Sequence, residues 1–185
     1  MIFTETPIAG AWLIELEPIG DERGWFARTF DVEQFRTRGL DPTVRQTSLS
    51  FNHRAGTLRG LHYQAEPHGE DKLVRCTAGA IFDVIVDLRE GSTSYLDWFG
   101  VELKARKRRM IYAPPGVAHG FQTLTDETEV HYQMSVDHRP ESASGVRWDD
   151  PELAIDWPEA ERIVSERDRS LPTLAERRAL ADARS

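Results

Sequence analysis

Cysteine is almost absent from this sequence, because Cys76 is the only one among 185 residues. A single cysteine cannot form an internal disulfide, and this usage is typical of a reducing compartment. Its apolar neighbours favour a thiol packed inertly in the core over a catalytic one. The first ten residues lack the basic segment with which a secretory signal begins. We therefore expect a cytoplasmic protein.

Long apolar runs and an excess of positive charge are also missing. No apolar run approaches the roughly 20 residues that a membrane-spanning helix requires, so we expect no membrane partner. A formal net charge of −8 disfavours nonspecific binding of nucleic acid. A few arginines lining a pocket could still hold a small anion.

Several nucleotide-binding and hydrolase motifs are absent as well. The sequence contains neither a Gly-x-Gly-x-x-Gly nor a phosphate-loop motif, and no Gly-x-Ser-x-Gly nucleophile turn. A phosphate-bearing ligand would therefore have to be held by arginine side chains.

The sequence does contain short strand-like segments separated by turn residues. The predicted strands cover residues 43–50, 72–77, 81–88, 95–103, 109–113, 120–124 and 129–136, with weaker alternation at 26–30. Their β-branched content favours strands, and turn signals at intervals of about 8 to 12 residues favour an all-β sandwich or barrel. Hydrophobic residues make up 39% of the chain and charged residues 29%, which is typical of a globular protein.

Helices are predicted at two places only. Asp31 can cap a short helix that presents Val32 and Phe35 on one face and ends near Gly39. Alanine, leucine, arginine and glutamate dominate residues 172–184, which favours a second helix.

The length of the chain is that of one domain, so we expect a single domain over residues 1–185. Its C-terminal segment, about 159–185, is expected to be partly helical and to pack on or near the barrel. Residues 139–158 are rich in proline and predict a long loop, and long loops within compact domains are often functional.

Two histidines lie in strand-like, turn-punctuated segments. His62 follows Arg-Gly-Leu and His119 follows Pro-Gly-Val-Ala, and each segment resembles one half of the cupin barrel signature. A cupin metal site usually takes a His-x-His pair from its first half, and Gln64 occupies the second of those positions. Two imidazoles and a nearby carboxylate could bind iron, so a metal-dependent cupin oxygenase or isomerase is one alternative. The missing ligand favours His62 as an acid–base residue without metal.

The neighbourhood of His62 leaves one question open. In a regular strand, Gly60 and His62 share a face and Arg59 points the other way. Arg59 would join the pocket of His62 only through a bulge or a twist.

A known family matches the chain from about residue 10 to residue 172. The matching segments, in order, are 59–64, 72–75, 82–89, 116–121, 148–151, 155–158 and 165–168. Together they resemble the dTDP-4-dehydrorhamnose 3,5-epimerase family. The resemblance implies a cupin-type jelly-roll barrel with a few short peripheral helices. It also implies a homodimer that exchanges edge strands, and no cofactor or metal.

The resemblance further implies a nucleotide-diphosphate 4-keto-6-deoxy sugar as substrate, inverted at the carbons that flank the ketone. A proton next to a carbonyl can be removed because the charge delocalises onto oxygen. Such an enzyme must supply a base, an acid on the opposite face and a cation at the enolate oxygen. By resemblance, His62 is the base, Asp168 its partner, Tyr132 the proton donor and Lys72 the cation near the ketone.

The same resemblance assigns further positions to substrate binding: Arg23, Phe26, Arg28, Gln46, Ser48, Arg59, His119, His138 and Arg167. Arg23, Arg59 and Arg167 match diphosphate contacts, Gln46 a nucleotide contact and Phe26 a pocket wall, while His119 is expected to be a hydrogen-bonding or structural residue of the pocket.

Three of these positions depart from the family pattern. Arg28 stands in place of glutamate, Ser48 in place of asparagine and His138 in place of tyrosine. These changes leave open which nucleotide and sugar are bound and whether one carbon or two are inverted. A 3-epimerase, or an epimerase of another nucleotide sugar, is therefore an alternative. A non-enzymatic sugar-nucleotide-binding barrel is disfavoured, because binding alone does not need the acid–base set.

Overall fold

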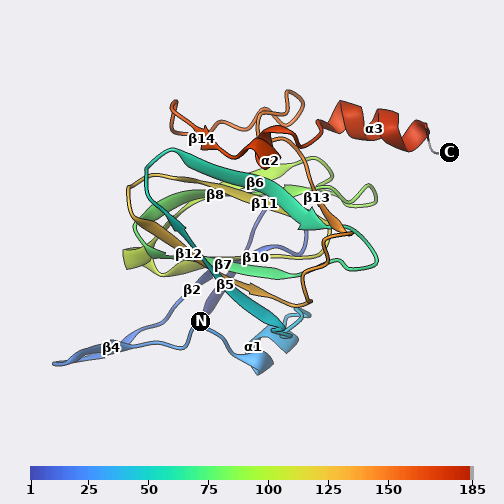
Figure 1. The fold of residues 1–185 in the computed structure, drawn as a ribbon. Helices are drawn as coiled ribbons and strands as arrows, with labels where there is room; N and C mark the ends of the chain where they lie inside the picture. Colours follow the sequence, from blue (N-terminus) through green and yellow to red (C-terminus); the bar gives the residue numbers. More distant parts are fainter. Residues whose placement is uncertain (184–185) are drawn as a thin grey trace.

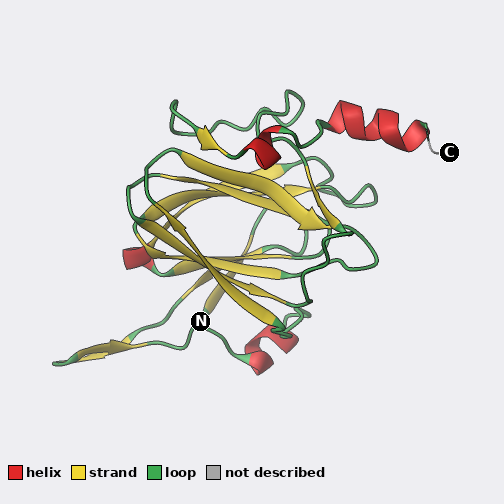
Figure 2. Ribbon diagram, in the orientation of Figure 1, coloured by secondary structure: helices red, strands yellow, loops and turns green. Residues whose placement is uncertain are grey.

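The computed structural model describes residues 1–183, and its main feature is a pair of β-sheets packed face to face (Figures 1 and 2). The first sheet runs in the order β1 (Ile2–Glu5), β2 (Trp12–Glu15), β10 (Arg109–Ala113), β7 (Lys72–Ala78), β12 (Thr128–Met134) and β5 (Gln46–Asn52). The second runs β13 (Ala143–Gly145), β6 (Thr57–Gln64), β11 (Val117–Thr123), β8 (Ala80–Asp87) and β9 (Trp98–Lys104), and β14 (Ile163–Val164) pairs in parallel with β6. From β5 to β8, and again from β9 to β13, successive strands alternate between the sheets, which makes an all-β jelly roll and confirms the predicted fold class.

The core lies between the two sheets and explains why the strands form where they do. Val74, Ile85, Phe121 and Val130 are at most 1% exposed and pack in one cluster. Burying each such side chain contributes about 1.5–3 kcal/mol. Cys76 belongs to this cluster, and burial raises the pKa of its thiol to about 11, so the thiol stays protonated and packs as an apolar group.

The seven clearly predicted strands all exist, with their ends within three residues of the observed ends. The prediction gave no bounds for the short strands β1, β2, β13 and β14, which have at most four residues each. It also gave none for β6, whose segment around His62 was described only as strand-like. The weakly indicated strand at 26–30 was wrong beyond Phe26. There the strand β4 (Gly24–Phe26) ends its three-residue pairing with β3 (Ile19–Asp21). These two strands form a separate hairpin that projects from the barrel (Figure 1).

The helices are short and lie at the periphery (Figure 2). α1 (Val32–Arg36) begins as predicted, because the Asp31 side chain accepts a hydrogen bond from Gln34 N at 3.1 Å. Phe35 is buried in this helix but Val32 is exposed. A 3₁₀ turn, η1 (Ala105–Lys107), follows β9. Among the helices in residues 1–183, none is long and apolar enough to cross a membrane.

Two further helices follow β14: α2 (Glu166–Arg169) lies over β6 of the second sheet, and α3 (Leu174–Asp182) extends to the side of the barrel (Figure 1). α2 begins with the Ser165 side chain accepting from Asp168 N at 3.1 Å. α3 lies within the predicted helix 172–184, whose last residue lies outside the described residues. Arg177 of α3 donates to Gly145 O at 3.0 Å, which ties the helix to β13.

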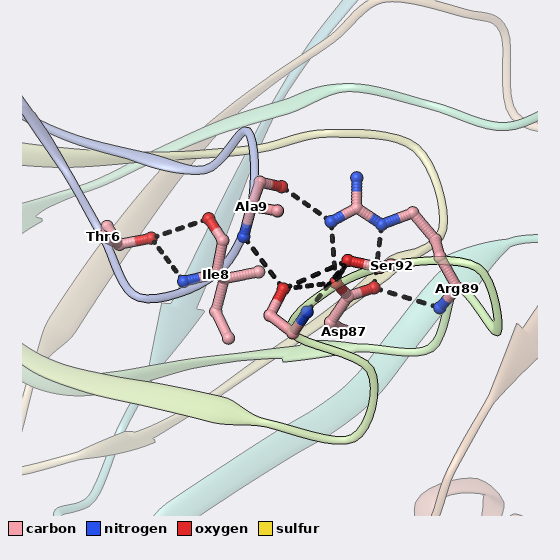
Figure 3. Close-up of polar contacts among 7 residues, drawn as sticks. Thr6, Ile8, Ala9, Asp87, Arg89 and Ser92 are labelled. Atoms are coloured by element: carbon pink, nitrogen blue, oxygen red, sulfur yellow. Dashed lines mark hydrogen bonds and ion pairs between the residues drawn. The ribbon is translucent and has the colours of Figure 1, made fainter.

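The end of β8 is tied to the N-terminal loop by a buried carboxylate (Figure 3). Asp87 accepts from Arg89 Nε at 2.8 Å and from the Ser92 and Ser94 hydroxyls at 2.5 and 2.6 Å. Ser94 in turn accepts from Ala9 N, and Arg89 donates to Ala9 O at 2.6 Å. The carboxylate therefore holds two segments together that lie far apart in the sequence.

Candidate active site

A pocket of about 600 Å³ opens between the two sheets at one end of the barrel. Strands β5, β6, β7, β11 and β12 and the start of α2 contribute to its wall. The predicted site residues that line it are Gln46, Ser48, Arg59, His62, Lys72, His119, Tyr132, His138, Arg167 and Asp168. Residues from six separated segments of the sequence therefore meet in one cavity.

The strand register explains why these side chains share the cavity. His62 of β6 lies directly opposite His119 of β11, and Tyr132 of β12 lies opposite Ser48 of β5. Side chains of directly paired residues lie on the same face of a sheet. The histidines thus belong to the wall formed by the second sheet and Tyr132 to the wall formed by the first.

A β-bulge brings Arg59 into the same pocket as His62. Phe121 pairs with Arg59 while His119 pairs with His62, so β6 has one more residue than β11 between these pairs. The extra residue reverses the alternation that would have turned Arg59 away. Gly60 lies at this point with φ +138°, and a Cβ there would approach the backbone of β11 to 2.6 Å, so the bulge requires glycine.

His62 is paired with a buried carboxylate. Its Nε2 lies 2.7 Å from Asp168 Oδ1, and Asp168 Oδ2 accepts from Gly60 N at 3.3 Å. Burial opposes ionisation of Asp168, but these hydrogen bonds outweigh it and hold the pKa of the carboxyl below its ordinary value. An ionised carboxylate only accepts, so Nε2 donates and Nδ1 keeps the free lone pair. That arrangement suits a general base.

Tyr132 faces the cavity from the opposite sheet. Burial raises the pKa of its phenol well above the ordinary value, and a hydrogen bond with Ser50 at 3.3 Å opposes this only in part. The phenol therefore carries its proton at neutral pH and can donate it.

Lys72 of β7 also lines the cavity and supplies a cation there. Its Nζ donates to His62 O at 3.1 Å and lies 2.9 Å from Glu70 Oε1. The side chain is 12% exposed, so its charge acts with little solvent screening.

His119 forms a second histidine–carboxylate pair, deeper in the barrel. Its Nε2 lies 2.7 Å from Asp83 Oδ2, and both side chains are at most 5% exposed. The ring meets Tyr132 edge to face at a centroid distance of 6.1 Å. His119 is thus a hydrogen-bonded part of the pocket wall.

Gln64, at the position of the missing metal-ligating histidine, has a structural role instead. Its Nε2 donates to His68 O at 3.1 Å and its Oε1 accepts from Arg139 N at 2.6 Å. It therefore fixes the start of the loop after residue 138. Within residues 1–183 no group of three or more histidine, cysteine or acidic side chains is placed to hold a metal ion.

Arg23 and Phe26 of the hairpin, and Arg28 just after it, do not line the pocket of their own chain. Arg23 is paired with Asp21 on the hairpin, and its side chain is 84% exposed. Phe26 is 70% exposed. Arg28 lies beyond the hairpin and pairs with the helix-capping Asp31 at 2.7 Å.

Comparisons with known proteins agree with this geometry. The family model described as dTDP-4-dehydrorhamnose 3,5-epimerase matches residues 5–176. The chain belongs to the dTDP-4-dehydrorhamnose 3,5-epimerase family. It is 46% identical to the dTDP-4-dehydrorhamnose 3,5-epimerase of Methanothermobacter thermautotrophicus over 94% of this chain and 95% of that one. It is also 41% identical to the dTDP-4-dehydrorhamnose 3-epimerase of Streptomyces niveus, over 92% and 83% of the two chains.

A solved structure of this family has the same fold. The dTDP-4-dehydrorhamnose 3,5-epimerase of Bacillus anthracis, crystallised with TDP and PPi bound, superimposes with a TM-score of 0.90 at 40% identity. The match covers 94% of this chain and 99% of that one. The chain is accordingly an isomerase with a cupin-like jelly roll.

The pocket of this epimerase fold also contains residues that were not predicted, among them Ser50, Glu70 and Ser165. Ser50 follows Ser48 at the two-residue spacing of a strand face, a signal that was present in the sequence. Ser165 begins the segment that resembles the family motif at 165–168. Glu70 had no signal, because its position depends on how the loop before β7 folds.

Proposed function

We propose that this chain inverts carbon 3, carbon 5 or both in a nucleotide-diphosphate 4-keto-6-deoxy sugar. The favoured reaction converts dTDP-4-dehydro-6-deoxy-D-glucose to dTDP-4-dehydro-L-rhamnose. The observation that carries the proposal is the position of His62 and Tyr132 on opposite walls of one pocket. Inversion needs a base on one face of the sugar and an acid on the other.

The reaction proceeds by proton transfer in both directions. His62 Nδ1 takes the proton from the carbon next to the ketone, and the C–H electron pair delocalises onto the ketone oxygen. The ammonium of Lys72 stabilises the resulting enolate oxygen. Tyr132 then donates its proton to the opposite face of the same carbon. Solvent then reprotonates the Tyr132 phenolate and takes the proton from His62. Both residues return to their starting states, so the reaction balances without a cofactor.

The substrate's diphosphate is assigned to arginine side chains. Arg59 and Arg167 line the same pocket as His62, and an arginine fork fits phosphate oxygens. Gln46, Ser48 and His138 lie together at the pocket wall, where Gln46 Oε1 accepts from His138 N at 3.0 Å. We assign this group to the nucleotide end of the ligand.

Solvent exchange tests the reaction directly. When the enzyme is incubated in D₂O with dTDP-4-dehydro-6-deoxy-D-glucose, deuterium should enter the sugar at the inverted carbons. Proton NMR measures this as loss of the signals of the exchanged protons. His62→Ala should abolish the exchange, and unchanged exchange in that variant would show that another group is the base. Parallel reactions with CDP- and GDP-linked keto sugars identify the nucleotide.

Inversion of carbon 3 alone is the second candidate, because one relative at 41% identity carries the name 3-epimerase. The number of deuterons retained in the product separates the candidates. Two deuterons mean that both carbons react, and one at carbon 3 means a 3-epimerase.

We propose a homodimer in which the β3–β4 hairpin of each chain reaches the pocket of its partner. Ile19 and Phe26 leave 76% and 70% of their surface exposed on this projecting hairpin. The edge strand β5, which bears Gln46 and Ser48, exposes Leu49 and Phe51 at 57% and 45%. Apolar surface of this kind favours an interface, and edge strands readily pair with another chain.

Mixing two inactive variants tests this arrangement. In a mixed dimer of His62→Ala and Arg23→Ala chains, one pocket combines an intact His62 with an intact hairpin if the hairpin acts on the partner. Activity should therefore return on mixing, after brief unfolding and refolding to exchange subunits. If the hairpin serves its own chain, every pocket keeps one defect and activity stays at the level of the single variants.

We also propose a cytoplasmic location. The support is the unpaired and buried Cys76, which suits a reducing compartment.

A further inference from the structure

Glu70 and Lys72 lie side by side in the pocket, separated by a residue that points the other way. Both line the cavity, whereas the Asp71 carboxylate accepts from the hydroxyls of Tyr112 and Ser135 outside it. Asp71 N donates to Ser135 Oγ at 2.9 Å, and Asp71 O accepts from Ser135 N at 3.1 Å. Two hydrogen bonds to the Asp71 backbone and two to its carboxylate therefore fix the residue between Glu70 and Lys72.

The contacts of the Lys72 ammonium leave one direction for a ligand. Nζ lies 2.9 Å from Glu70 Oε1 and donates to His62 O at 3.1 Å. An ammonium has three N–H donors, so one remains for an oxygen in the pocket. The side chains of Lys72 and Glu70 are only 12% and 10% exposed, so water competes little for these positions.

We propose that Glu70 is a positioning residue that holds the Lys72 ammonium in place for the enolate oxygen; this rests on the proposed function. Lysine has a flexible four-carbon stem and no preferred fork geometry. The carboxylate of Glu70 and the His62 carbonyl together restrict the ammonium to one place and tie it to the strand that carries the base. A buried ammonium without this partner would move toward solvent.

Three variants separate positioning from general destabilisation. Glu70→Ala removes both oxygens and should lower kcat by about tenfold or more, because small displacements of catalytic groups cost this much. KM should change less than about threefold, because Lys72 acts on the charge that develops during reaction. Glu70→Gln keeps an oxygen acceptor for the ammonium and should retain most of kcat. Glu90→Ala is the control, since Glu90 is exposed and lies away from the pocket.

A double-mutant cycle with Lys72→Met shows whether Glu70 acts through Lys72. In the Lys72→Met background, Glu70→Ala should have no further effect on the rate of deuterium exchange. A full additional loss, or a rise in KM at unchanged kcat, would overturn the proposal, as would equal losses in the Ala and Gln variants. If Glu70→Ala fails to fold, Glu70→Met replaces it at similar volume. Lack of exchange by the unaltered enzyme would instead contradict the proposed function.

Discussion

Replacing Asp168 by asparagine tests the histidine–carboxylate pair at constant shape. The amide has nearly the same size and can still contact His62 Nε2 and Gly60 N, which now lie 2.7 and 3.3 Å from the carboxylate oxygens. The charge is lost, and the side chain can present NH₂ instead of oxygen. The imidazole is then no longer held with Nδ1 as its basic nitrogen.

The expected loss follows from the geometry of the pair. A carboxylate and an imidazolium with charges centred about 4 Å apart attract each other by about 4 kcal/mol at an effective dielectric constant near 20. Because 36% of the His62 side chain is exposed, we halve this attraction to about 2 kcal/mol for screening. Without this attraction, the positive charge that develops on the imidazole during proton transfer is less stabilised by the same amount, which slows the reaction roughly 30-fold. Loss of the fixed tautomer adds to it, so kcat should fall by about 30-fold to 10³-fold.

Proton NMR in D₂O measures this loss as the initial rate of deuterium entry into the keto sugar. KM should stay within about threefold, since Asp168 bonds to His62 rather than to the substrate in the proposed reaction. Circular dichroism and thermal unfolding of the variant control for folding. An exchange rate within threefold of the unaltered enzyme would refute the reasoning, because His62 would then work as a base without its carboxylate.

Three other perturbations have defined outcomes. Tyr132→Phe should keep solvent exchange next to the ketone but lose inverted product, because His62 still removes the proton; inverted product at an undiminished rate in the NMR assay would exclude Tyr132 as the donor. Gly60→Ala places a Cβ 2.6 Å from the backbone of β11 at φ +138° and should lower the free energy of unfolding in urea by about 2–4 kcal/mol. Gly91→Ala, which meets nothing within 4 Å, should change it by less than about 1 kcal/mol. Burial opposes ionisation of Asp87, yet hydrogen bonds from Arg89 and two serines lower its pKa to about 2. This depressed pKa contributes about 2 kcal/mol of stability that is present above pH 4 and lost as the pH falls toward 2. In Asp87→Asn this loss of stability at low pH should disappear. If the free energy of unfolding in urea fell as steeply between pH 5 and pH 2 in Asp87→Asn as in the unaltered protein, the prediction would be contradicted.

Most of the longer strands were predictable from the sequence because burial between two sheets leaves a local pattern. The core strand β8, with apolar residues such as Ile81 and Ile85, carries it strongly. The short strands β1 and β2 carry too few residues to show it. The position of β2 depends on pairing with β10, which comes about 100 residues later, and β1 in turn pairs with β2. Such pairing is a property of the whole fold and has no local signal.

The pocket depended on one feature that alternation alone cannot predict. A regular β6 would place Arg59 on the face opposite His62. The bulge at Gly60 changes this, and it forms because the backbones of β6 and β11 approach too closely for a side chain. Glycine in a strand signals such an approach in general. Only the register between β6 and β11 shows that the side chains of Arg59 and His62 lie on the same face of the sheet.

The family resemblance assigned Arg23, Phe26 and Arg28 to substrate binding, but it could not say which chain they serve. A sequence motif indicates which residue type is needed at a position. The motif is identical whether that residue contacts the substrate in its own subunit or in a partner subunit. Arg23 and Phe26 are exposed on the hairpin and Arg28 follows it, and none of the three lines the pocket of its own chain. This is why the mixed dimer, rather than a single variant, is the informative experiment.

The two histidines show why the sequence could not rank the candidate bases by local context alone. His62 and His119 are direct neighbours across β6 and β11, and each lies 2.7 Å from a buried carboxylate. What separates them is exposure, since 36% of the His62 side chain is accessible and only 5% of the His119 side chain. A base must reach the substrate and afterwards release its proton to solvent. Pairing with a carboxylate is therefore compatible with either a structural or a catalytic histidine, and access to the cavity mouth favours His62 as the base.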